Sequence, residues 1–86
     1  MYEEIISRFQ NRLGKIQDKV DEGLLYLFAQ FEVEDLLKDA IQTRTLLEKA
    51  GIDRDLRTEL DVVINQISQY LEDLKDLIEI EKLKTL

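Results

Sequence analysis

The chain has 86 residues, a formal net charge of −7 at pH 7, and no cysteine, histidine or proline. A chain of this length forms a single domain, and it lacks disulfides, thiol chemistry, and the commonest general base and metal ligand. The acidic balance argues against binding to nucleic acid or to an anionic membrane surface, because both are negatively charged.

The first predicted element is a helix over residues 2–22. Its apolar residues recur at spacings of four and three, at Tyr2, Ile6, Phe9, Leu13, Ile16 and Val20. This alternation places them on one face of a helix, as in the a and d positions of a coiled coil. Gly23 is the predicted break, because it follows Asp21 and Glu22 on that face, and a glycine inside a helix costs roughly 1 kcal/mol relative to alanine.

Four basic residues share one flank of this first helix: Arg8, Arg12, Lys15 and Lys19. We expect this basic stripe to be solvated or to pair with acids on a neighbouring helix, with Glu59 and Asp73 as natural partners. Contact with nucleic-acid phosphates is disfavoured, because the charge of the whole molecule opposes it.

The next segment, Leu24 to Phe31, is apolar nearly all round. As a helix it would have to be buried on most sides, and it is far shorter than the ~20 residues of a membrane-spanning helix. The apolar phase slips near Phe31 and Val33. We therefore expect a kink or short break near residues 31–34, and the second helix begins at either residue 24 or residue 34.

Tyr26, Phe28 and Phe31 bring half of the aromatic residues of the chain into one short segment. One interpretation packs them as an aromatic plug in the core at the corner of the hairpin. The other makes them a partner-binding surface, because aromatic residues anchor protein interfaces. A membrane-surface helix is disfavoured, since the flanking charges are acidic rather than basic.

Residues 49–53 predict the turn between the second and third helices. Gly51 suits the left-handed position after a helix, and Ile52 follows it for the accompanying hydrophobic contact. Asp53 suits the N-cap of the next helix, and Asp55 favours its first turn. The second helix then spans about 24–50 and the third about 54–83, and so short a connection makes them antiparallel neighbours.

The third helix carries the longest apolar stripe, at Leu56, Leu60, Val63, Ile67, Tyr70, Leu74 and Leu77. A second apolar row widens it, at Ile64, Leu71 and Ile78. So wide a face should lie against at least two helices. A helix of thirty residues, about 45 Å long, also exceeds the ~30 Å diameter of a compact domain of this size. We expect a bundle interface or an interface with a second copy to use Ile67, Tyr70, Leu71, Leu74, Leu77 and Ile78.

The predicted fold is all-α: an antiparallel three-helix bundle or long helical hairpin with coiled-coil-like heptad stripes, completed by dimerisation. No catalytic, cofactor-binding or metal-binding residue is predicted, because the apolar stripes hold no inward carboxylates and the acids lack the spacing of a calcium loop or a helical di-metal site. The acidic N-terminus lacks the basic residues of a secretory signal, which favours a cytoplasmic protein.

The expected function is non-enzymatic protein–protein interaction, as an assembly or regulatory subunit, with itself or another protein as the partner and with no nucleic acid, membrane or cofactor. Two alternatives stay open. One is an acidic inhibitor of the phage type, which occupies a basic nucleic-acid-binding groove of a partner. The other is a purely structural oligomerisation module.

Overall fold

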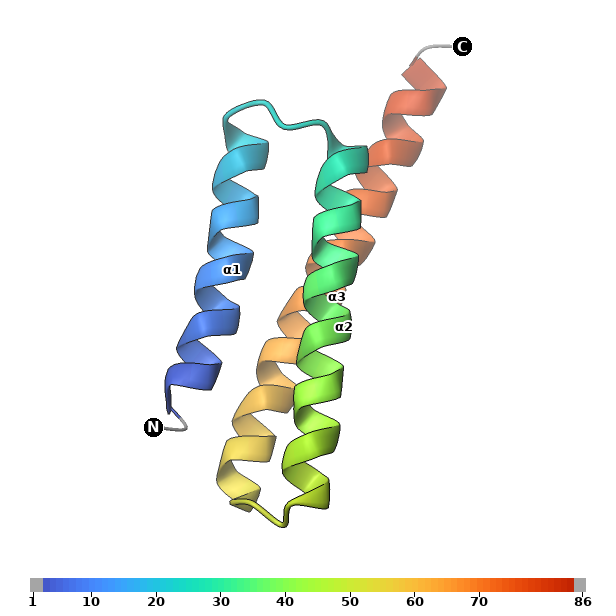
Figure 1. The fold of residues 1–86 in the computed structure, drawn as a ribbon. Helices are drawn as coiled ribbons and strands as arrows, with labels where there is room; N and C mark the ends of the chain where they lie inside the picture. The colour runs from blue at the N-terminus through green and yellow to red at the C-terminus, as the bar shows by residue number, and fades with distance from the viewer. Residues whose placement is uncertain (1–2, 85–86) are drawn as a thin grey trace.

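The computed structural model describes residues 3–84, and within this range the chain forms three helices and no strand. The helices are α1 (Glu3–Asp21), α2 (Tyr26–Lys49) and α3 (Arg54–Lys84). The chain reverses direction at both connections, so the helices lie side by side (Figure 1). The prediction of an all-helical chain with three helices is confirmed. Tyr2, the first residue of the predicted stripe, lies outside the described residues.

The first helix ends at Asp21, and Gly23, where the sequence predicts a break, lies in the turn that follows. The Leu24 N–H donates to the carbonyl of Lys19 at 2.8 Å, and the Gly23 N–H donates to the carbonyl of Val20 at 3.0 Å. Gly23 has a φ of 112°, which L side chains rarely adopt. This is the Schellman arrangement, in which a glycine with positive φ lets the last carbonyls of a helix find donors.

The second connection repeats this arrangement at the predicted position. Gly51 has a φ of 67°, and the Ile52 N–H donates to the carbonyl of Leu47 at 3.1 Å. The carboxylate of Asp53 then accepts a hydrogen bond from the Asp55 N–H at 2.9 Å. Asp53 therefore caps α3 as expected, because its side chain satisfies one of the backbone donors left free at a helix N-terminus.

The second helix is continuous from Tyr26 to Lys49, so the predicted break near residues 31–34 is absent. Ala29, Val33, Leu36 and Ala40 are completely buried, and their spacings of four, three and four place them on one face. The apolar pattern does not distinguish Phe31 from Val33 as candidates for burial, whereas in the structure only Val33 is buried. The change of phase therefore marks an exposed apolar residue, not a break in the helix.

The core is one apolar cluster drawn from all three helices. From α1 it takes Phe9, Leu13 and Ile16; from α2, Ala29, Val33, Leu36, Ala40 and Leu47; and from α3, Leu56, Leu60, Val63, Ile67, Leu71 and Leu74. Each fully buried Leu or Ile contributes about 1.5–3 kcal/mol relative to its exposed state. Since α1 supplies only three buried residues, most of the core belongs to α2 and α3.

An ion-pair cluster also joins α2 to α3. The guanidinium of Arg44 hydrogen-bonds the carboxylate of Asp61, and its Nη1 lies 2.9 Å from Glu48 Oε2. The hydrogen bond to Asp61 and the charge of that carboxylate raise the pKa of Arg44 above its ordinary value, with a smaller contribution from Glu48. Arg44 therefore stays charged and links the two helices.

The molecule is elongated, with dimensions of 52 × 20 × 15 Å. At about 1.5 Å per residue, α3 is ~46 Å long and α2 is ~36 Å long. The last turns of α3 accordingly extend beyond the start of α2 (Figure 1). Within residues 3–84, none of the helices has a stretch that is both long and apolar enough to cross a membrane.

Candidate functional site

An apolar surface lies at the start of α2, next to the connection from α1. We call it the corner patch, and it consists of Leu25, Leu27, Phe28 and Phe31. Their exposed fractions are 63%, 51%, 53% and 53%. Phe31 lies one turn beyond Leu27 and Phe28, so the three side chains are neighbours on the helix surface. The interpretation of Phe28 and Phe31 as an aromatic plug in the core is therefore wrong, and so is burial of this segment on most sides.

The third aromatic residue of this segment has a different environment. Tyr26 is half-buried and packs against the core, as does Tyr70 of α3. Burial raises the pKa of Tyr70, and the nearby negative charge of Asp21 adds to the effect. Of the three aromatic residues predicted to bind a partner, the structure thus exposes Phe28 and Phe31 and turns Tyr26 toward the core.

A groove adjoins the corner patch and runs between the start of α2 and the end of α3, with a volume of about 650 Å³. Leu25, Tyr26, Leu27 and Gln30 line it at the start of α2, where Leu25 is the residue before the helix. From α3 it is lined by Ile78 and by five charged residues: Lys75, Asp76, Glu79, Glu81 and Lys82. Because Leu25 and Leu27 belong to both features, the groove continues the corner patch toward α3, where its lining is mostly charged.

The residues predicted for the interface on α3 fall into two groups. Ile67, Leu71 and Leu74 are buried within the chain, so a second copy cannot reach them. Tyr70 and Ile78 are half-buried. Leu77 is partly exposed, and these last three remain accessible at the end of the helix.

The last turns of α3 expose two apolar residues, Ile80 and Leu83, that were not among the predicted interface residues. Leu77, Ile80 and Leu83 are exposed by 37%, 48% and 70% and follow one another at intervals of three. The heptad pattern requires apolar residues at positions 81 and 84, where Glu81 and Lys84 stand. Ile80 and Leu83 lie off that pattern, and a search for apolar residues outside the heptad positions would have found them.

Two residues of the basic stripe of α1, Arg12 and Lys19, pair with acids of α2. Arg12 Nη2 lies 3.1 Å from Asp39 Oδ2, and Lys19 Nζ lies 3.2 Å from Glu32 Oε1. The predicted partners Glu59 and Asp73 on α3 are therefore wrong, although pairing with a neighbouring helix is correct. Both pairs are exposed, and such pairs contribute no more than about 1 kcal/mol each.

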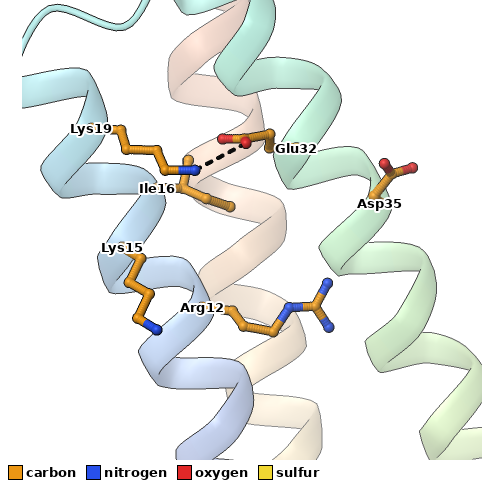
Figure 2. Close-up of a pocket in the computed structure, with 6 residues that line it drawn as sticks. All are labelled: Arg12, Lys15, Ile16, Lys19, Glu32 and Asp35. Carbon is orange, nitrogen blue, oxygen red and sulfur yellow. Dashed lines mark hydrogen bonds and ion pairs between the residues drawn. The ribbon is translucent and has the colours of Figure 1, made fainter.

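Arg12, Lys15 and Lys19 of the stripe line a small pocket between α1 and α2, with a volume of about 260 Å³ (Figure 2). Lys19 reaches across to Glu32, while the side chain of Lys15 points away from that pair. The pocket holds Asp35 as well as Glu32, so its three cations face two carboxylates. This mixture of signs does not favour a phosphate group.

The described part of the chain contains no cluster of three His, Cys, Asp or Glu side chains arranged to hold a metal ion. Comparison with protein-family models, with curated proteins and with solved structures finds no match. The exposed surface of the molecule is therefore where a function has to be sought.

Proposed function

We propose that this protein is a non-enzymatic protein–protein interaction module that binds its partner through the corner patch. The observation that carries the proposal is the exposure of Phe28 and Phe31. A Phe side chain offers about 150–250 Å² to be buried, so four half-exposed residues leave roughly 400 Å² of apolar surface. Apolar patches of about 300–600 Å² on monomers are often functional.

The size and position of the patch support this role. A stable interface covers about 800 Å² on each partner, so the corner patch supplies the apolar centre of such an interface and the adjoining groove extends it. Aromatic residues are enriched at interface centres. The patch lies mainly on a continuous helix whose buried face packs into the core, so a partner meets a preformed surface.

Affinity capture with three versions of the chain tests the proposal. The wild type is compared with Phe28→Ser/Phe31→Ser and with the control Leu46→Ser, which removes another exposed apolar residue of α2 outside the patch. We expect proteins that the wild type and the control retain to be lost with the double variant. Circular dichroism verifies that all three versions are folded. The same set of proteins on all three, or none on the wild type, would count against the proposal.

Self-association through the end of α3 is a second candidate, which would complete the predicted dimer. Leu77, Ile80 and Leu83 are symmetric about Ile80. Two α3 ends that pair antiparallel would place Leu77 level with Leu83 of the other copy, and Asp76 level with its Lys84. The opposite charges of Asp76 and Lys84 favour this pairing, whereas the like charges of Glu79 and Glu81, which the same register also brings level, oppose it.

The area limits the strength of such a dimer. The three side chains expose roughly 250–300 Å² together, well below the ~800 Å² per partner of a stable interface. We therefore expect weak self-association. Light scattering across concentration tests it, with Leu83→Ser as the disruptive variant. A wild type that remains monomeric at high micromolar concentration would exclude this dimer.

A further inference from the structure

We infer that the corner patch binds an amphipathic helix whose apolar residues are flanked by lysine or arginine. The inference rests on the proposed function, because it names the partner of the same surface. It follows from the charges that surround the patch and from the dimensions of its apolar part.

Every charged residue between Lys19 and Lys38 is acidic: Asp21, Glu22, Glu32, Glu34 and Asp35. Two precede the corner patch in the chain and three follow it. Glu34 and Asp35 lie three and four residues after Phe31, so they border its ring one turn along α2. Both are exposed. On the side of the groove, α3 adds three acids and two lysines: Asp76, Glu79, Glu81, Lys75 and Lys82. The patch is therefore apolar in its centre, and the charges at its border are predominantly acidic.

Among the described residues, only one of these five acids forms an ion pair. Glu32 pairs with Lys19, and Glu34 accepts a hydrogen bond from the neutral amide of Gln30 at 2.8 Å. Within residues 3–84, Asp21 and Asp35 form no ion pair, and Asp35 lines the same pocket as Arg12, Lys15 and Lys19. A partner that brings cations to Asp21 or Glu34 gains attraction without displacing an existing ion pair.

The same charges decide between occupants. A second copy docked patch to patch would bring its own five acids against these five, and like charges in an interface are unfavourable. An anionic membrane surface meets the same repulsion. A helix with basic flanks has the complementary charge, and charge complementarity gives an interface its specificity and raises its association rate.

The dimensions suit a helix of a few turns. Residues 25–31 span about 9 Å along α2 at ~1.5 Å per residue. Apolar side chains at i, i+3 or i+4, and i+7 of a partner helix cover about this length, which is the usual spacing of helix-in-groove recognition. The groove between Leu27 and Ile78 can accept one of these side chains.

Two fluorescent peptides of about five helical turns test the inference by anisotropy. They carry leucine at the same positions, and one has lysine and the other glutamate at the flanking positions. The protein is used as wild type, as Phe28→Ser/Phe31→Ser and as Glu34→Gln/Asp35→Asn. A matched control, Glu4→Gln/Glu59→Gln, removes two exposed acids near the starts of α1 and α3. These helix starts lie at the other end of the molecule from the connection between α1 and α2 (Figure 1).

We expect the lysine peptide to bind the wild type and the glutamate peptide to bind far more weakly. The serine double variant should raise the Kd of the lysine peptide about 30-fold, the loss typical of a truncated hot spot. Glu34→Gln/Asp35→Asn should raise the Kd of the lysine peptide about fivefold, whereas the control Glu4→Gln/Glu59→Gln should raise it less than about twofold. Binding should weaken as salt increases.

Equal binding of both peptides would overturn the basic-helix inference while leaving the patch as a binding surface. Equal binding of the lysine peptide to all protein variants, or no binding to the wild type, would also overturn the inference. So would a dimer in sedimentation equilibrium that the serine double variant abolishes, because a second copy would then be the occupant. The affinity-capture experiment does not depend on the peptides. A failure of the proposed function itself is therefore distinguished from a failure of the basic-helix inference.

Discussion

The substitution Gly14→Ala is expected to raise the free energy of unfolding, whereas Gly51→Ala is expected to lower it. Gly14 lies inside α1, and a Cβ added there meets no atom within 4 Å. The gain is therefore the difference in helix propensity, about 1 kcal/mol. Gly51 has a φ of 67°. In that left-handed region, alanine destabilises the folded state by ~1–2 kcal/mol relative to glycine. Alanine also lowers the conformational entropy of the unfolded chain, which stabilises the fold by only ~0.4–1 kcal/mol.

Urea denaturation followed by circular dichroism measures both effects. The two variants should differ by about 2 kcal/mol, which corresponds to roughly 8–16 °C in Tm for a chain of this size. Gly23→Ala should also destabilise, because its φ of 112° lies farther from the conformations open to alanine. A destabilised Gly14→Ala variant with an unchanged denaturant slope would refute the assignment of an uninterrupted, open-faced α1.

Three further predictions concern single side chains. Asp53→Ala should lower the free energy of unfolding by about 1 kcal/mol, because it removes the cap of α3; unchanged stability in the same assay would contradict this. Leu36→Ala should cost about 2–5 kcal/mol at a completely buried site, whereas Phe31→Ser should change stability by about 0.5 kcal/mol or less. Comparable losses would place Phe31 in the core. The raised pKa of Tyr70 predicts stability that is fully present below its unfolded pKa of 10.0 and falls as pH rises through that value toward the folded pKa. Tyr70→Phe should therefore lose less stability than the wild type between about pH 9 and pH 11, and identical pH profiles would contradict the assignment.

The ends of the helices could be predicted from the sequence because local rules decide them. The succession Gly51, Ile52 and Asp53 contains the left-handed stop, the hydrophobic contact and the next cap within three residues. Gly23 was recognisable for a similar reason. None of these features depends on how distant parts of the chain pack.

The surface could not be predicted, because periodicity identifies apolar residues and not the elements that cover them. The partners of Arg12 and Lys19 depend on where α1 lies against α2 and α3, and the acids Asp39 and Glu32 of α2 are the ones within reach. Ala29 is the residue of α2 that identifies the buried face of this segment. It continues the four–three spacing of the buried face backward from Val33, which leaves Phe28 and Phe31 on the outside.

Phe28 and Phe31 contribute little to the fold that contains them. The buried face of their segment is formed by Ala29 and Val33, and serine is about as favourable as phenylalanine in a helix. Two polar residues would therefore support the same helix and the same core. The half-exposed phenyl rings instead keep an unfavourable contact with water in the free chain, which burial against a partner would relieve. The core does not need Phe28 and Phe31, and yet the surface exposes both. This is the physical reason to look for function at the corner patch.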